Sequence, residues 1–88
     1  MFRITVVCGG LTDAEGTGAV ADVLEEFSRR PWHQQVECIW AEATLSLSAS
    51  NDYDRTGQAL LDEFGDAILA CLSPAGAIRS KVAAVVVQ

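Results

Sequence analysis

The sequence predicts an α+β fold in which two helices cover one face of a four-stranded antiparallel sheet. Segments with the two-residue period of strands flank two segments with the 3.6-residue period of helices. Their order is strand, helix, strand, strand, helix, strand, and 88 residues hold one such unit without a linker. Residues 82–87 are apolar without alternation, so a strand built from them has two hydrophobic faces. We therefore expect a single domain over residues 1–88 that self-associates.

The first strand and the first helix are separated by a change of period. Alternating apolar side chains predict a strand over residues 2–8, which ends at two glycines. Thr12 and Glu15 have the spacing of a capping box, which predicts that the helix begins next to Thr12. Gly16 and Gly18 oppose that start, because each costs about 1 kcal/mol relative to alanine inside a helix. In the alternative interpretation, the helix begins after Gly16.

The second half of the chain contains two strands, a helix and a last strand. The period is two over residues 36–50 with a break at residues 41–43, which predicts a hairpin. No Asn-Gly or Asp-Gly pair marks the turn, so one long bent strand is the alternative. An apolar stripe over residues 57–72 predicts the second helix, with Asp54 as its N-cap, and the last strand follows over residues 78–87.

This order is that of the ferredoxin-like fold, or split β-α-β arrangement, which leaves one face of the sheet open. About half of the last strand lies on that face. The other residues expected there are Arg3, Thr5, Val7, Ser46 and Ser48. We expect a homodimer that closes through this open sheet face.

Charge and cysteine content limit the partners and the compartment. Twelve acidic and six basic residues give a net charge of −6, which repels nucleic acid and anionic lipid, so we expect neither as a partner. The three cysteines form no CxxC pair and fall on apolar segments, which is typical of reduced thiols. No segment resembles a signal peptide or a membrane span. We expect a soluble, cytoplasmic, acidic protein.

Two motif-like patterns have competing explanations. The run from Gly16 to Ala21 fits a dinucleotide fingerprint, but it begins too far after the strand to place a pyrophosphate on the helix N-terminus. Asp52, Asp54 and Glu63 fit part of a calcium loop, but Glu63 lies more than two helical turns from Asp52. We therefore expect no cofactor and no metal, and Asn51, Asp52 and Asp54 are expected to form an Asx turn and cap the helix.

Two regions are candidates for chemistry or ligand binding. His33, the only histidine, is the first suspect for a general base acting on an acidic substrate proton. The glycine loop after the first strand offers backbone amides to a ligand. The weaker candidates for ligand binding are Gly9, Gly10, Asp52, Asp54 and Arg55.

The function favoured by the sequence is that of a structural or regulatory binding module, not an enzyme. One alternative is a small cofactor-independent isomerase or monooxygenase of the dimeric α/β-barrel kind, with a cavity beside His33. Another follows from the loop Gly9-Gly10-Leu11, because the topology and this loop are similar in outline to amino-acid-binding ACT domains. That resemblance implies a small effector bound near the loop and at a dimer interface.

Overall fold

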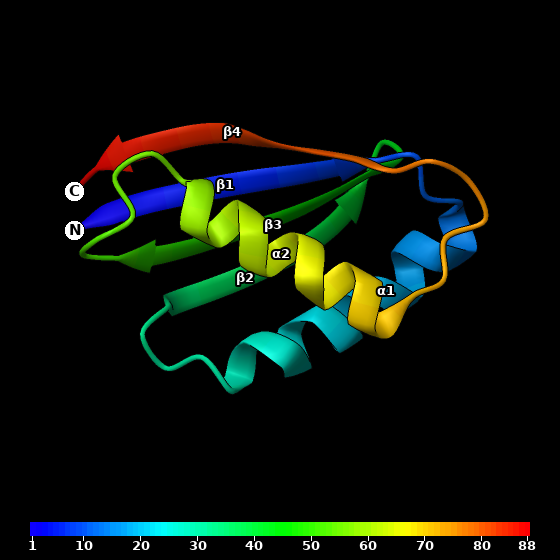
Figure 1. Cartoon of the computed structure of the whole chain (residues 1–88), viewed down its shortest axis with the longest axis horizontal. Coiled ribbons are helices and arrows are strands. Elements are labelled where there is room, and N and C mark those ends of the chain that lie inside the picture. The colour runs from blue at the N-terminus through cyan, green and yellow to red at the C-terminus, as the bar shows by residue number, and fades with distance from the viewer.

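The computed structural model describes all of residues 1–88 and has the predicted ferredoxin-like topology (Figure 1). Its elements are β1 (Phe2–Gly9), α1 (Asp13–Ser28), β2 (Gln34–Ala41), β3 (Thr44–Asn51), α2 (Gln58–Cys71) and β4 (Arg79–Val87). The sheet order is β2-β3-β1-β4, with every neighbouring pair antiparallel. Both helices pack on one face, so the prediction of an α+β fold with an open sheet face is confirmed.

The core lies between the helices and the two central strands. Alternate residues of β1 and β3 point to the helices and are fully buried, because strand side chains alternate between faces. Each helix contributes one apolar stripe to the same cluster. The largest buried side chains of this core are those of Phe64, Ile4, Leu45, Leu47, Leu60 and Ile68. Neither helix is long and apolar enough to cross a membrane.

The N-terminus of α1 is capped as the sequence predicts. The Thr12 hydroxyl accepts a hydrogen bond from the Glu15 amide at 3.2 Å, and the Glu15 carboxylate accepts one from the Thr12 amide at 2.8 Å. The helix therefore begins at Asp13, and the later start is wrong. Gly16 has a packing reason to be there, because the Trp40 ring of β2 occupies the space of a Cβ atom.

Glu15 also connects the start of α1 to the segment before β4. Its second oxygen accepts a hydrogen bond from the Ala75 amide at 3.1 Å. The backbone amides of Thr12 and Ala75 hold the pKa of Glu15 below its usual value of 4.5. The unfolded chain therefore binds this proton more readily than the folded protein. The stabilisation from Glu15 is present above pH 4.5 and is lost as the pH falls through the lowered pKa.

We expect Glu15→Gln to lower stability at neutral pH, because an amide has one acceptor oxygen where the carboxylate uses two. The difference between the two proteins should shrink as the medium is acidified. Urea denaturation of both proteins across the acid range measures it. An equal loss of stability with acidification in both proteins would contradict the role given to Glu15.

The turn between β2 and β3 confirms the hairpin and rules out one long bent strand. Glu42 and Ala43 have φ angles of 53° and 58°, and they connect residues 41 and 44, which pair across the two strands. Positive φ at both turn positions is the geometry that suits the twist of a hairpin. It is normally supplied by Asn or Gly, whereas this turn uses residues with an ordinary Cβ. The sequence therefore carries no turn signal here.

The two ends of the chain lie side by side (Figure 1). β1 and β4 are adjacent and antiparallel, and Phe2 pairs with Val87. The Gln88 amide donates a hydrogen bond of 2.8 Å to the Met1 carbonyl. The sheet thus extends to the ends of the described chain.

Candidate functional site

His33 lies in the segment between α1 and β2, and its side chain is fully buried. Its Nε2 atom lies 2.6 Å from a carboxylate oxygen of Glu63 on α2, and its Nδ1 atom lies 3.3 Å from the side-chain nitrogen of Asn51 at the end of β3. The imidazole therefore connects the loop, the sheet and the second helix.

The orientation of Asn51 determines the tautomer of His33. The Asn51 side-chain oxygen accepts hydrogen bonds from the backbone amides of Tyr53 and Asp54, at 3.2 and 2.8 Å. Its NH₂ group must then point to His33 and donate to Nδ1. Nδ1 is thus an acceptor, and Nε2 carries the proton that is donated to Glu63.

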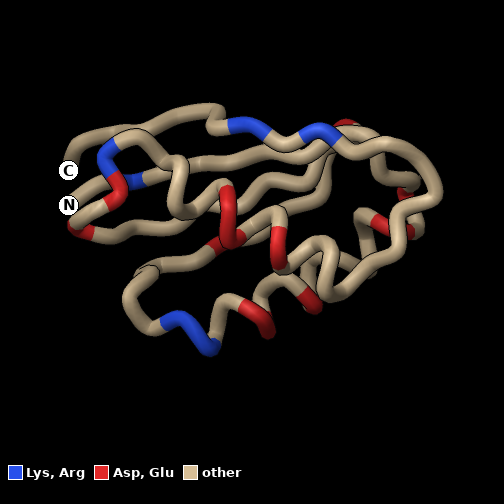
Figure 2. Tube along the Cα trace, viewed as in Figure 1, with Lys and Arg blue, Asp and Glu red and all other residues tan.

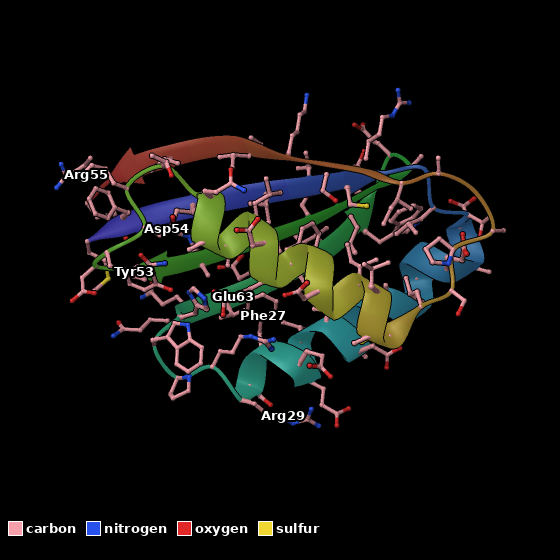
Figure 3. All side chains as sticks on the ribbon, viewed as in Figure 1. Phe27, Arg29, Tyr53, Asp54, Arg55 and Glu63 are labelled. Atoms are coloured by element: carbon pink, nitrogen blue, oxygen red, sulfur yellow. The ribbon has the colours of Figure 1, made fainter.

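The remaining surroundings of His33 are aromatic and cationic. Arg30 forms an ion pair with Glu63, with 3.1 Å between Nε and Oε1, and its guanidinium lies 5.1 Å from the centre of the Phe27 ring. Phe27, Trp32 and Tyr53 have ring centres 5.7, 6.0 and 6.3 Å from that of His33. In Figure 3, Phe27 and Glu63 are labelled close to each other near the helices, and Tyr53 is labelled on the loop that follows β3.

Both nitrogens of His33 are thus occupied by partners from the same chain, and the imidazole faces no cavity. A general base needs a free lone pair within reach of a substrate proton. The structure provides instead a buried histidine that holds three elements together. Burial, followed by the charges of Glu63 and Asp54, raises the pKa of Tyr53 above its usual value of 10.

The acidic loop before α2 has a structural role at Asp54. Its buried carboxylate accepts hydrogen bonds from the amides of Ala59 and Leu60, at 3.2 and 2.8 Å, and so caps the helix. By position, however, the N-cap residue is Gly57, three residues later. Asp52 and Arg55 are exposed. No cluster of three His, Cys, Asp or Glu side chains suited to a metal ion is present.

The cysteines are free thiols with little nucleophilic character. Cys8 is fully buried in the core. Burial raises the pKa of Cys38 to about 11, and burial followed by the charges of Glu26 and Asp22 raises that of Cys71. A thiol that stays protonated at neutral pH is a poor nucleophile.

The open face of the sheet is polar along its centre. Thr5 and Ser48 are joined by a hydrogen bond of 2.9 Å between their hydroxyl groups. Arg3 donates to the Gln35 carbonyl at 2.6 Å and forms an ion pair of 3.3 Å with Glu37. Gln35 has a φ of 51° at an irregularity in β2, and the Arg3 contact connects this bulge to β1 across β3. These polar groups are satisfied within the chain.

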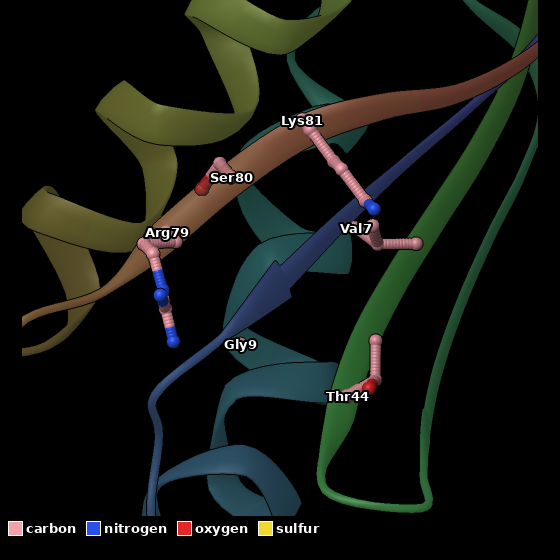
Figure 4. A pocket seen from close by; sticks show the side chains of 6 residues that line it. All are labelled: Val7, Gly9, Thr44, Arg79, Ser80 and Lys81. Carbon is pink, nitrogen blue, oxygen red and sulfur yellow. The ribbon is translucent and has the colours of Figure 1, made fainter.

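A hollow of about 380 Å³ lies on the same face, at the opposite end of β1 from His33. It spans three neighbouring strands. Its lining residues are Val7, Gly9, Thr44, Arg79, Ser80 and Lys81. In Figure 4, Gly9 is bare ribbon between the side chains of Arg79 and Thr44. Of the candidate ligand-binding residues of the sequence analysis, Gly9 alone lines this hollow.

Gly10 has a different role from its neighbour. Its φ of 97° is one that side chains rarely adopt, and the Ala77 carbonyl occupies the space of a Cβ atom. Gly10 therefore allows the chain to leave β1 beside the segment that enters β4. Arg79 and Lys81 cannot be recognised as site residues from the sequence, because only the pairing of β4 with β1 brings them to Gly9.

Charge is divided between the two layers (Figure 2). The acids on the helices are Asp13, Glu15, Asp22, Glu25 and Glu26 of α1 and Asp62, Glu63 and Asp66 of α2. The strands contain one acid, Glu37, and three bases, Arg3, Arg79 and Lys81. An acidic protein thus presents a basic sheet.

No protein-family model, no curated protein and no solved structure matches this chain significantly.

Proposed function

We propose that the protein is a binding module, not an enzyme, that forms a homodimer through its sheet with β4 at the centre of the interface. The observation that carries this proposal is that β4 is an edge strand with apolar side chains on both faces. Such an edge is a template for pairing with another chain unless something blocks it.

The second half of β4 is the apolar part. Val86 lies on the open face and is 56% exposed, and Val87 is 75% exposed. Val82 and Val85 pack against the core from the helix side but remain half-buried. Apart from the bulge opposite Thr5, no charge or proline protects residues 84–87, although these are the usual means of protecting an edge strand.

The centre of the open face contributes less to such an interface than the sequence suggests. Thr5, Ser48 and Arg3 already use their polar groups within the chain, and apolar side chains are sparse between the two edges. The other edge strand, β2, is interrupted by the bulge at Gln35 and exposes Glu37. These features favour the β4 side of the sheet over the whole face.

A second copy of this chain is the partner that charge favours. Antiparallel pairing of two β4 strands about a twofold axis continues one sheet into the other and satisfies the free backbone groups. It places Arg79 and Lys81 of one copy beside the apolar end of the other copy, away from their own counterparts. The acids of the helix layer lie outside the interface.

Light scattering over a concentration series tests the proposal. The wild-type protein should have the mass of a dimer, and Val86→Asp should raise its dissociation constant at least about a hundredfold, because a carboxylate must lose water at the interface while its neighbour Arg3 is already paired with Glu37. Leu69→Asp is the matched control, since Leu69 is 65% exposed on α2. It should remain dimeric.

Circular dichroism must show that both variants keep the fold. A wild-type monomer at every concentration would contradict the proposal, as would a Val86→Asp protein with the mass of the wild type. Dissociation by Leu69→Asp instead would place the interface on the helix layer.

A further inference from the structure

We propose that the hollow over Gly9 is a binding site for a small phosphorylated molecule, whose phosphate group lies between Arg79 and Lys81. This inference goes beyond self-association, because the hollow is formed by one chain. Three observations carry it: the shape of the hollow, the free charges at its rim and the absence of acids from its lining.

Gly9 creates the shape. On one side, Gly9 pairs with Arg79 of β4. On the other side, the preceding residue Cys8 pairs with Leu45 of β3, which places Gly9 beside Thr44. A side chain on Gly9 would fill the space between these neighbours. An added Cβ meets nothing within 4 Å, which shows that the space is open and that the backbone tolerates a larger residue. A volume near 380 Å³ lies in the lower part of the range of about 300–1,000 Å³ typical of small-molecule sites.

The two cations of the hollow have no counter-ion in the chain. Arg3, Arg29 and Arg30 all form ion pairs with glutamates. Arg79 and Lys81 form none, although acids outnumber bases two to one. Both are exposed on the same face of β4, with Cα atoms roughly 7 Å apart because they are two residues apart on a strand. Two unpaired cations at this spacing fit one dianion between them.

The nearby groups favour phosphate over a neutral ligand. A guanidinium and an ammonium together balance the charge of about −2 that a phosphate monoester carries above pH 7. Thr44 also lines the hollow, whereas Ser80 pairs with Cys8 of the core and therefore directs its side chain to the helix side. No acid lines the hollow to repel the anion. The hollow also offers more space than a phosphate group alone fills, so we expect an organic phosphate.

Titration of the ¹⁵N-labelled protein with glycerol 3-phosphate, followed by NMR, tests this site. We expect chemical-shift changes that saturate and cluster at the amides of residues 9, 44 and 79–81. Glycerol at the same concentrations should produce none. Inorganic phosphate should bind more weakly than the ester, and malonate, a dianion with two carboxylates, more weakly than either.

Four variants distinguish binding in the hollow from non-specific attraction of the anion to surface cations. Arg79→Gln and Lys81→Gln should each weaken binding about tenfold. Arg55→Gln removes an exposed cation without an ion pair elsewhere on the surface and should change the dissociation constant less than about twofold. Gly9→Val leaves every charge in place but adds a side chain that occupies the hollow above residue 9, and it should also weaken binding about tenfold. The amide spectrum of each variant establishes that the fold is retained.

Several outcomes would overturn the inference. They are the absence of saturable shifts at tens of millimolar glycerol 3-phosphate, shifts spread over all exposed cations, and an equal loss of binding in Arg55→Gln. Binding that is unaffected by Gly9→Val would exclude the hollow even if Arg79 attracts anions. Tighter binding of malonate than of both phosphates would reject phosphate as the ligand class.

Discussion

Gly16→Ala is expected to lower the free energy of unfolding by about 2–3 kcal/mol, although alanine is the better helix former by about 1 kcal/mol. The added methyl group would overlap the indole of Trp40, which packs across α1 at this position and against the core. Either the ring must leave its place or the helix must move away from β2. Urea denaturation with constant m-value measures the change.

Gly18→Ala is the matched control for this effect. Gly18 is two residues further along the same helix, is exposed, and has nothing within 4 Å of an added Cβ. There the propensity gain is unopposed, and stability should rise by about 0.5–1 kcal/mol. In a double variant with Trp40→Leu, Gly16→Ala should lose most of its cost relative to Trp40→Leu alone. If Gly16→Ala stabilised the protein as much as Gly18→Ala, the close contact with Trp40 would be refuted.

His33→Ala is expected to cost about 3 kcal/mol of stability, because it leaves a cavity among aromatic rings and deprives the buried Asn51 and the half-buried Glu63 of their partner. Asn51 loses the acceptor of its NH₂ group, and Glu63 keeps only Arg30. Loss of the contact between loop, sheet and helix should appear as a lower midpoint in both thermal and urea unfolding.

His33→Gln and Arg55→Ala are the two controls for this prediction. A glutamine amide can restore one of the two hydrogen bonds, so it should recover part of the lost stability. Arg55 is exposed without an ion pair, and its replacement should change stability by less than about 0.5 kcal/mol. A His33→Ala protein as stable as the wild type would refute the structural role and reopen the interpretation of His33 as a catalytic base.

The sequence predicts the fold well because the relevant signals are local. The capping box at Thr12 and Glu15 places the start of α1 correctly, against the opposing signal of Gly16 and Gly18. That conflict arises from Trp40, a residue 24 positions away whose contact with Gly16 no local pattern reveals. The same holds for the turn at Glu42 and Ala43, whose backbone is determined by strand pairing and not by its own residues.

The candidate sites were less predictable because they are assembled across the sheet. The glycine loop makes Gly9 a candidate through its backbone, but Arg79 and Lys81 reach it only through the register of β1 with β4. His33 is a candidate base as the lone histidine, yet its Nε2 atom is occupied by Glu63, 30 residues later. In the sequence of a helix, a glutamate that contacts a buried histidine cannot be distinguished from a glutamate exposed to solvent.

The hydrogen bond between Gln88 and Met1 makes the path of the backbone nearly a closed ring. A short peptide bridge across these ends would join β4 directly to β1, and new ends opened at the Glu42–Ala43 turn would start the chain at β3. Every contact of the core would remain in such a circular permutant, while the sequence order of its elements would differ. For the same reason, the domain can be inserted into a surface loop of a host protein without spreading the two ends of that loop.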